Sequence, residues 1–186
     1  MIPNVERWRG TASQVLEALR VADPDRLAMA GNLNLTMENV TDLVLALIQK
    51  ESSGNPHPVP GDRGCSFGLM QYNWCAHNST RDETLVPVQT NGGWELQPVG
   101  LMLLEDPFNN IALGSRYLLT QILEFADVNH AILAYNAGPG ETYRWLTGEI
   151  PQPVNASYLA TVLSILGLSE TSYEDLKKKP WGSALS

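Results

Sequence analysis

The feature of this sequence that most restricts its fold is an apolar stripe that recurs at helical spacing between Thr36 and Glu51. The apolar members of the stripe are Val40, Leu43, Val44, Leu47 and Ile48, which precede Glu51 by eleven, eight, seven, four and three residues. Residues at these intervals share one face of an α-helix, so the pattern predicts a helix with one buried side. Thr36 is a suitable N-cap, and Gly54-Asn55-Pro56 predicts the end of the helix.

Glu51 continues this buried face, where a carboxylate is out of place. Burial disfavours the charged form of a carboxyl group and raises its pKa, and such an acid can protonate a leaving group near neutral pH. On periodicity alone, the favoured interpretation is that Glu51 turns into water or pairs with Lys50 or Arg63. A catalytic role for Glu51 therefore depends on the motifs that follow it.

Helical patterns also dominate the rest of the chain. Helices are expected near residues 15–19, from 23–25 onward, and over 106–122, 129–137, 143–146, 158–166 and 173–178. Two short β-like runs, 84–89 and 94–99, flank the hairpin signal Asn91-Gly92-Gly93, and Pro87 and Pro98 restrict both runs to edge strands. The sequence predicts one mainly α (α+β) domain over 1–186, with a motif-bearing core at about 36–166 and a β-hairpin at about 84–100.

Composition excludes several classes of protein. The chain has 186 residues, 44% of them hydrophobic and 17% charged, which fits a globular domain and not a disordered chain. No run reaches the roughly 18 to 20 apolar residues that a membrane-spanning helix needs. A net charge of −8 repels phosphate backbones at long range, so nucleic-acid binding is not expected.

We expect no cofactor and no metal, because no nucleotide, redox or metal-ligand motif is present. His57, His77 and His130 are interpreted as surface or loop residues. Cys65 and Cys75 are too few for a disulfide scaffold, so two free thiols are the favoured interpretation. A bridge between them stays open if the protein reaches an oxidising compartment. The first twenty residues show no secretory signal pattern.

Three short motifs in a fixed order carry a resemblance to a known family. They are Glu51-Ser52-Ser53-Gly54-Asn55-Pro56, Gly68-Leu69-Met70-Gln71 and Ala134-Tyr135-Asn136-Ala137-Gly138. Together they resemble the soluble-type lytic transglycosylases of glycoside hydrolase family 23. That family's helix before the third motif is matched by Asp106-Pro107, Asn110-Ile111, Gly114 and Tyr117-Leu118, and Tyr158 stands where the family has its last active-site tyrosine. The resemblance covers roughly residues 43–163 and implies a lysozyme-like fold.

The resemblance also implies a reaction: cleavage of the β-1,4 bond between MurNAc and GlcNAc in peptidoglycan, with a 1,6-anhydro product. Glu51 would protonate the leaving oxygen and, once ionised, remove the proton of the C6 hydroxyl. The N-acetyl group of the muramoyl residue can assist, and the mechanism needs no second carboxylate. One well-placed glutamate fits these requirements.

A second family shares part of the pattern. Gly61-Asp62-Arg63-Gly64 followed by 67–71 resembles the goose-type lysozymes, which hydrolyse the same bond. Asp62 matches one of the two carboxylates with which that family positions water, but Asn73 stands where the second is expected. An amide cannot accept a proton from water, so the sequence argues against a two-carboxylate inverting hydrolysis but leaves it as an alternative. The interpretation of Asp62 as an ordinary turn residue is equally favoured.

The other motif residues are expected to position the substrate or the acid. Gly68 lets the backbone approach a sugar closely, and Gln71 both donates and accepts hydrogen bonds. Tyr135 and Asn136 can hold the glutamate or an acetamido group. The structural alternatives are that Asn136 belongs to an ordinary helix terminus and that Met70 is a core residue rather than part of the substrate site.

Four further candidates have structural alternatives of similar weight. Ser52 orients Glu51 or bonds its own helix backbone. Tyr158 hydrogen-bonds Glu51 or caps the core. Trp74, near the Gln71 motif, and Trp94, in the hairpin, can line the groove, where aromatic faces stack on sugars. For Trp94, packing of the hairpin onto the helices is at least as favoured.

We therefore expect a peptidoglycan lytic transglycosylase, with two alternatives: a goose-type muramidase, and a non-catalytic peptidoglycan-binding or virion structural protein. The expected partner is the peptidoglycan glycan strand. The small cofactor-free domain and the missing signal pattern favour a bacteriophage enzyme, either an endolysin or one carried with other virion proteins, that acts at the host periplasm or cell wall. The acidic charge gives no attraction to an anionic wall and favours the carried enzyme.

Overall fold

The computed structural model describes residues 1–77 and 84–168. In chain order its elements are α1 (Pro3–Glu6), α2 (Arg9–Ala22), α3 (Pro24–Asn32), α4 (Met37–Ser52), β1 (Ser66–Phe67), β2 (Tyr72–Asn73), α5 (Trp74–His77), β3 (Leu85–Thr90), β4 (Gly93–Pro98), η2 (Leu101–Leu103), α6 (Pro107–Phe125), α7 (Val128–Ala137), α8 (Pro139–Leu146) and α9 (Ala156–Ile165). The mainly α class with a small hairpin is confirmed. The helix predicted at 173–178 lies outside the described residues.

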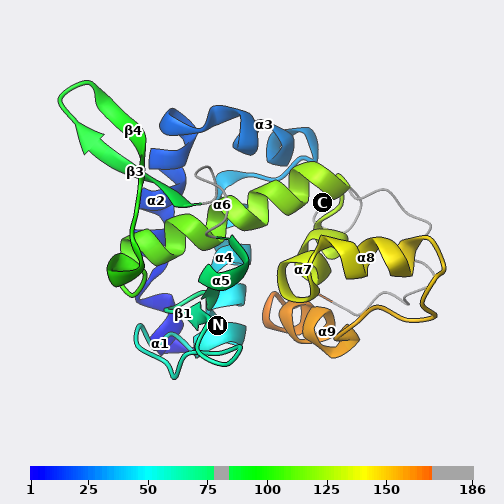
Figure 1. Cartoon of the computed structure of the whole chain (residues 1–186). Coiled ribbons are helices and arrows are strands. Elements are labelled where there is room, and N and C mark those ends of the chain that lie inside the picture. Colours follow the sequence, from blue (N-terminus) through cyan, green and yellow to red (C-terminus); the bar gives the residue numbers. More distant parts are fainter. Residues whose placement is uncertain (78–83, 169–186) are drawn as a thin grey trace.

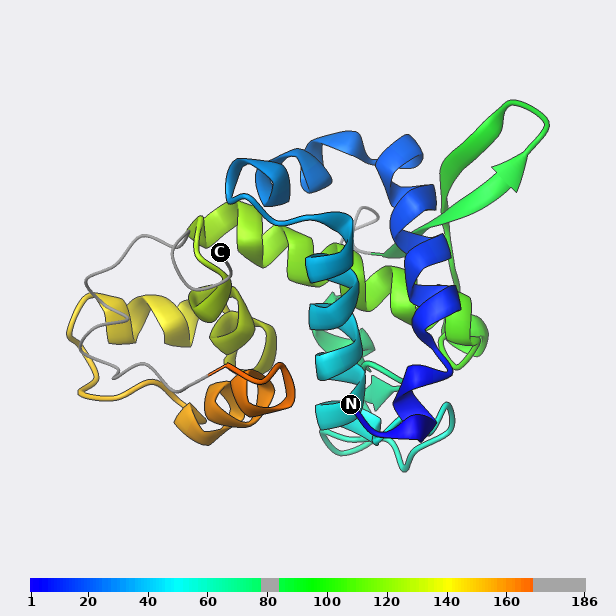
Figure 2. The ribbon, with the colours of Figure 1, turned by 180° about the vertical axis from the view of Figure 1, so that it is seen from behind.

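Helix α6 runs through the middle of the molecule and organises the other helices (Figure 1). It packs against α2, α3 and α7. Seen from behind in Figure 2, α4 stands between α2 and α9, and it contacts both. The end of α4 therefore lies where the N-terminal helices and the C-terminal helices come together.

Helix α4 is the helix predicted from the apolar stripe. Thr36 and Asn39 form a reciprocal capping box, in which Thr36 Oγ1 accepts from Asn39 N (3.1 Å) and Asn39 Oδ1 accepts from Thr36 N (2.9 Å). The buried face carries the predicted apolar residues. The helix ends as Ser53 and then Gly54 adopt left-handed backbone angles, with φ of 52° and 77°.

The predicted hairpin is formed by β3 and β4, paired from Leu85 with Pro98 to Thr90 with Gly93. This register leaves Asn91-Gly92 as a two-residue turn. The sheet has two strands, so Pro87 and Pro98 lie on edge strands as expected. The hairpin projects from one end of the molecule (Figure 1). A second pair, β1 with β2, was not predicted because each strand has only two residues.

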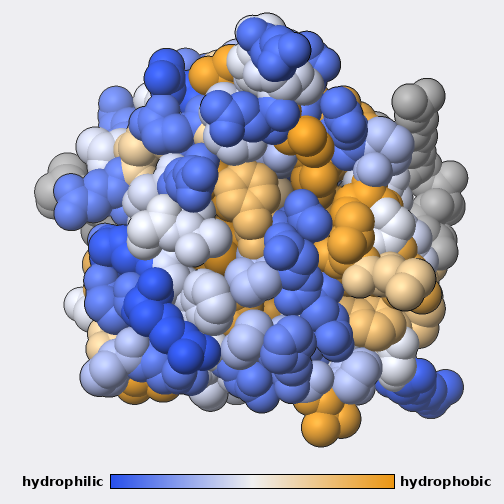
Figure 3. Space-filling model, turned by 90° about the vertical axis from the view of Figure 1, so that its left-hand side faces the viewer, coloured by the Kyte–Doolittle hydropathy of each residue, from blue (hydrophilic) through white to orange (hydrophobic). Residues whose placement is uncertain are grey.

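Helices α6 and α7 begin at predicted positions with acidic N-caps. Asp106 accepts from Asn109 N (3.0 Å), and Asp127 accepts from His130 N (2.9 Å). The apolar side chains of α2, α4, α6, α7 and α9 form a continuous core. Hydrophilic groups dominate the face drawn in Figure 3, with hydrophobic ones in separate clusters. None of the described helices is long and apolar enough to cross a membrane.

Two interpretations favoured from the sequence are wrong, and for the cysteines the structure contains the bridge that the sequence left open. Cys65 and Cys75 are joined in a disulfide, with 5.4 Å between their Cα atoms. The β1–β2 pair turns the chain back on itself, so that Trp74 N donates to Cys65 O (2.9 Å) and the two cysteines meet. His130 is buried, 8% exposed, with its ring edge-on to Trp145 at 5.7 Å, because its face of α7 turns toward α8.

Candidate active site

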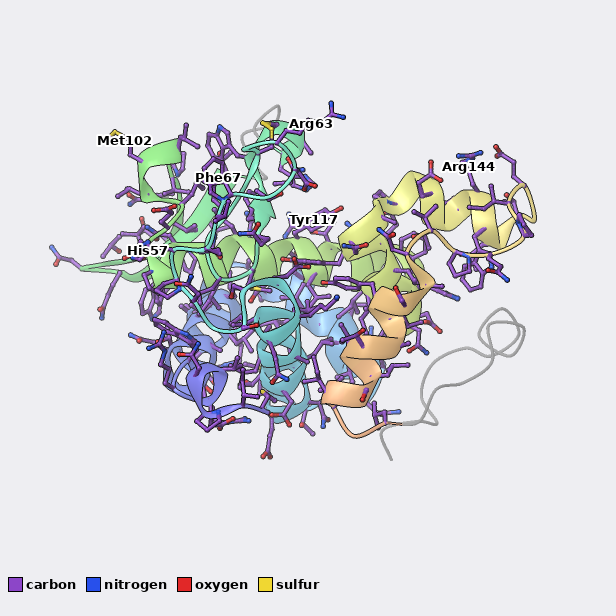
Figure 4. The ribbon with its side chains drawn as sticks, turned by 90° about the horizontal axis from the view of Figure 1, so that it is seen from below. His57, Arg63, Phe67, Met102, Tyr117 and Arg144 are labelled. Atoms are coloured by element: carbon purple, nitrogen blue, oxygen red, sulfur yellow. A yellow bond between two sulfur atoms is a disulfide. The ribbon has the colours of Figure 1, made fainter. Side chains whose placement is uncertain are left out.

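A cleft of about 490 Å³ lies against the end of α4, between the β1–β2 segment, α6 and the start of α8. The candidate residues that line it are Glu51, Asp62, Gln71, Asn73, Tyr135 and Asn136. In Figure 4, Tyr117 of α6 lies between the segment that carries Arg63 and Phe67 and the helices α7 and α8. The three motifs, far apart in the sequence, thus meet at one cavity.

Glu51 occupies the last turn of α4 and is largely buried. Burial raises the pKa of Glu51 from its usual 4.5 to about 6. The hydrogen bond from Tyr158 and the charge of Lys50 oppose this rise, and the negative charge of Asp62 adds to it. The carboxyl group is thus partly protonated near neutral pH, which a general acid requires.

Two tyrosines flank this carboxyl group. The hydroxyl of Tyr158, on α9, donates to Glu51 Oε1, and Tyr158 itself is 5% exposed and does not line the cleft. The hydroxyl of Tyr135 donates to Met70 O (2.9 Å). Burial raises the pKa of both tyrosines well above 10, so both hydroxyls stay protonated and act as donors.

Asp62 lies in the cleft on an exposed turn with a left-handed backbone, φ 48°. Its Oδ2 accepts from Ser66 Oγ (2.6 Å) and from Asn73 Nδ2 (3.1 Å). Asn73 Oδ1 in turn accepts from Ala76 N (3.0 Å), at the start of α5. Asn73 therefore orients Asp62, and both amide ends of Asn73 are occupied by protein partners.

Gln71 and Gly68 shape the wall of the cleft through the backbone. Gln71 Oε1 accepts from Gly61 N (2.9 Å), and Gln71 Nε2 donates to Gly68 O (3.2 Å). Gly68, with φ 70°, packs so closely on Asn110 that a side chain would overlap the amide. The glycine serves this packing rather than a direct approach to sugar.

Asn110 of α6 is the buried residue that holds this motif, and it is 0% exposed. Its side chain accepts from Met70 N and donates to Phe67 O and Leu104 O, each at 2.8 Å. Two of these bonds are to backbone groups of the segment around Gly68, and the third is to Leu104 just before α6, so one side chain ties the Gly68–Gln71 loop to the start of α6. Asn110 belongs to the matched family helix, but no local pattern in the sequence indicates this role.

Four other candidates lie outside the cleft lining, and their contacts favour the structural alternatives. Ser52 Oγ donates to Ile48 O (3.1 Å), which is a bond to its own helix. Met70 is 0% exposed and packs on Gly114. Trp74 packs against the core, and Trp94 stacks on Phe108 with ring centroids 5.8 Å apart.

The cleft also contains three residues that were not predicted from the sequence, His77, Tyr117 and Asn155. The rings of His77 and Tyr117 lie 4.2 Å apart and form part of the wall. Asn155, before α9, donates to Asn136 Oδ1 (2.8 Å) across the cleft end. Tyr117 had a signal in the matched family helix, whereas His77 and Asn155 lie outside every quoted motif. His77 is partly exposed at the end of α5, where its ring faces the cleft.

This arrangement supplies one acid of raised pKa, neutral hydrogen-bond donors around it, and an aromatic wall. Among the described residues that line the cleft, only Glu51 and Asp62 carry carboxyl groups. Such a site can protonate a leaving oxygen and can hold a polar substrate along a groove.

Comparison with known proteins gives a family match. A sequence model of the transglycosylase SLT domain matches residues 30–152. Two relatives are named membrane-bound lytic murein transglycosylase C. The one from Yersinia enterocolitica is 35% identical over 121 residues, 61% of this chain and 31% of the relative. The one from Photorhabdus laumondii is 37% identical over 110 residues, 55% of this chain and 28% of the relative.

A solved structure has a similar fold. It is an inactive mutant of the lytic transglycosylase Slt from Pseudomonas aeruginosa, with a TM-score of 0.53 and 24% identity. The match covers 75% of this chain and 22% of that chain. This chain therefore spans less than a third of the length of each of these proteins.

Proposed function

The chain belongs to the transglycosylase SLT domain family, and from this premise we propose that it is a lytic transglycosylase of peptidoglycan. It cleaves the β-1,4 bond between MurNAc and GlcNAc and leaves a 1,6-anhydro end, with Glu51 as the single acid and base. The observation that carries the proposal is the largely buried Glu51 carboxyl group, which lines the cleft, has a pKa of about 6 and accepts a hydrogen bond from Tyr158.

In the first step Glu51 acts as the acid. With a pKa of about 6, roughly a tenth of the Glu51 carboxyl groups are protonated at pH 7. The proton moves to the glycosidic oxygen as the bond from that oxygen to C1 of MurNAc breaks. The resulting carboxylate faces the developing positive charge at C1, and Tyr158 stabilises that carboxylate by its hydrogen bond.

In the second step Glu51 acts as the base. The C6 hydroxyl oxygen of the same MurNAc attacks C1 and closes the anhydro ring, and its proton returns to the Glu51 carboxylate. Glu51 is thereby restored, and no water is consumed. Tyr135 and Gln71 are proposed to keep the cleft walls in the geometry that this closure needs.

Product analysis tests the proposal. Purified sacculi are incubated with the protein, and the released muropeptides are measured by mass spectrometry. Anhydro-ended products support the transglycosylase. Reducing-end products, which are heavier by one water, would show that the protein is a muramidase. The absence of any soluble product would show that it is a binding protein.

The second candidate is a goose-type muramidase. It is favoured by the position of Asp62, a carboxylate in the same cleft that Ser66 and Asn73 orient. A carboxylate held in this way can position a water molecule for inverting hydrolysis. Against this candidate stands Asn73, whose amide replaces a second acid and cannot accept a proton.

We further propose that a larger assembly, such as a bacteriophage virion, carries the enzyme to the cell wall. The supporting observation is the net charge of −8, which gives no attraction to an anionic wall. The named relatives are bacterial and membrane-bound, so a bacterial assembly is the alternative carrier. Detection of the chain in purified virions supports the first carrier, and its absence from them contradicts it.

A further inference from the structure

The N-terminal segment binds the end of the helix that carries Glu51. This segment, residues 2–8, precedes the part of the chain that the family model matches, 30–152. Its donors to the end of α4 are Ile2 N to Gln49 Oε1 (3.1 Å), Asn4 Nδ2 to Ser53 O (2.5 Å), Arg7 Nη2 to Gly54 O (2.9 Å) and Trp8 Nε1 to Gly54 O (2.9 Å). We call residues 2–8 the N-terminal clamp.

The clamp supplies what the end of α4 lacks. The last carbonyl groups of a helix have no partner inside the helix, and terminal turns fray unless other groups bind them. Ser53 is the C-cap of α4 and Gly54 is the next residue, and their carbonyls accept three of the clamp's hydrogen bonds, so the clamp holds the turn that ends the helix. The positive guanidinium of Arg7 also suits the negative end of the helix dipole.

The backbone that follows Glu51 is strained and needs such support. Ser53 has φ 52°, a region that residues with a side chain rarely adopt and that persists only where the surroundings hold it. Gly54 has φ 77°, and a side chain there would overlap the backbone carbonyl of Asn4. The clamp thus lies in direct contact with the turn, and Gly54 is the residue that allows this contact.

We propose that the N-terminal clamp positions Glu51: by binding the carbonyls of Ser53 and Gly54, it fixes the last turn of α4 and keeps the Glu51 carboxyl group against Tyr158. Arg7 and Trp8 are the main positioning residues, because both donate to one carbonyl and Arg7 also lies over the Trp8 ring at 4.8 Å. This inference rests on the proposed function of Glu51.

The consequence for catalysis follows from burial. Burial is the largest cause of the raised pKa of Glu51, and the residue sits one turn or less from the clamped carbonyls. A looser turn lets water reach the carboxyl group, which favours its charged form. Loss of the clamp therefore lowers the pKa of Glu51, so that the carboxyl group loses its proton at a lower pH. It also misplaces the carboxyl group for both proton transfers.

The test combines Arg7→Met with Trp8→Phe in the full chain, which removes both donors to Gly54 O and keeps most of the side-chain packing. The matched control is Arg20→Met, which removes an exposed arginine of α2 that pairs with Glu17. We expect kcat on sacculi to fall about tenfold, the expected size for two lost hydrogen bonds, with KM changed less than twofold. The pH above which activity declines moves lower, and the control keeps wild-type values.

Hydrogen exchange provides a readout that needs no turnover. We expect the amides of residues 51–55 to exchange faster in the double variant, while the middle of α4 keeps its protection. The variant that combines Arg7→Lys with Trp8→Phe retains a donor at position 7, so its kcat should be higher than that of the variant that combines Arg7→Met with Trp8→Phe. If the double variant unfolds at the assay temperature, Trp8→Phe alone is measured below its Tm and shows the same changes at smaller size.

Two outcomes would overturn the inference, and a third would overturn the proposed function instead. A folded double variant with unchanged kcat and an unchanged pH profile would make the clamp a stabilising contact only, even if its Tm is lower. Unchanged exchange at residues 51–55 would show that the turn does not depend on the clamp. If the wild-type chain releases no product at all, the proposed function fails, and the exchange result separately decides whether the clamp holds the turn.

Discussion

Tyr158 donates its hydroxyl to Oε1 of Glu51 across a sequence separation of 107 residues. This bond joins the end of α4 to α9, and it favours the charged form of a carboxyl group whose burial favours the neutral form. The two effects leave Glu51 with a pKa of about 6, between that of an ordinary carboxylate and that of a fully buried acid. A group that must donate and then accept a proton benefits from this balance.

Tyr158→Phe removes the bond and keeps the ring. Because the hydrogen bond lowers the pKa of Glu51, its loss raises that pKa, and the pH above which activity declines moves higher. We expect kcat to fall at least tenfold, since a hydrogen bond to a charged group is worth about 1.5–3 kcal/mol. A pH profile of product release measures both changes, and a profile that moves lower would contradict the sign.

Glu51→Gln should abolish product release and leave the fold intact. It should also stabilise the protein at neutral pH. The pKa of Glu51 is about 6 in the folded protein, against a usual value of 4.5 that we take for the unfolded chain. The contribution of this carboxyl group to stability is therefore complete below pH 4.5 and is lost as the pH rises through 6. Glutamine has no such loss, and the gain is about 1–2 kcal/mol at pH 7.

Urea unfolding at two pH values checks this prediction. The variant and the wild type should differ more at pH 7 than at pH 4.5. Equal differences at both pH values would show that burial does not shift the titration of Glu51, and near-wild-type turnover would show that Glu51 is not the acid.

The sequence predicted those parts of the fold that depend on local patterns. The apolar stripe predicted α4 and its end, and Asn91-Gly92 predicted the hairpin turn, because periodicity, caps and turn residues act within a few positions. The meeting of the cysteines was not predicted, since it depends on the two-residue strands β1 and β2, which are too short to leave a pattern.

The site shows the same division. The motifs identified Glu51, Gln71 and Tyr135, each in a recognisable local context. The pairing of Asn155 with Asn136 and the packing of His77 on Tyr117 depend on how α7, α9 and α5 are placed by the core. Gly68 was expected to let the backbone approach a sugar, but the group packed against it is the Asn110 amide.

Gly68→Ala tests this assignment. Both Gly68 and Gly64 have positive φ, 70° and 90°, but a Cβ on Gly64 meets no described atom within 4 Å, whereas one on Gly68 overlaps the Asn110 amide. Gly64→Ala therefore costs only backbone strain, about 1 kcal/mol, and Gly68→Ala costs about 2–4 kcal/mol because it also disrupts the bonds of Asn110. Thermal unfolding compares the two, and equal losses would remove the special role of Asn110.

Asp62→Asn separates the two candidate reactions. In the transglycosylase Asp62 only adds to the raised pKa of Glu51, so its loss lowers that pKa slightly and changes turnover by a few fold at most. In a muramidase Asp62 holds the attacking water, and its loss would cost about a hundredfold or more. Turnover and product mass are measured together, with Asp25→Asn on α3 as an exposed control. A large loss with anhydro products would contradict both accounts.

Replacing Cys65 and Cys75 with serine should weaken the wall of the cleft. The disulfide closes the segment 65–75, whose regular structure is two 2-residue strands and the start of a 4-residue helix, so the bridge adds a covalent constraint to the hydrogen bonds that hold this segment. Closing a loop of this size is worth about 2–3 kcal/mol. Gln71 and Asn73 reach the cleft from this segment, and Asp62 accepts hydrogen bonds from Ser66 and Asn73 within it, so we expect turnover to fall as well as Tm. Addition of a reductant should reproduce both losses in the wild type and leave the serine variant unchanged; a wild type insensitive to reductant would show that the bridge does not support the site.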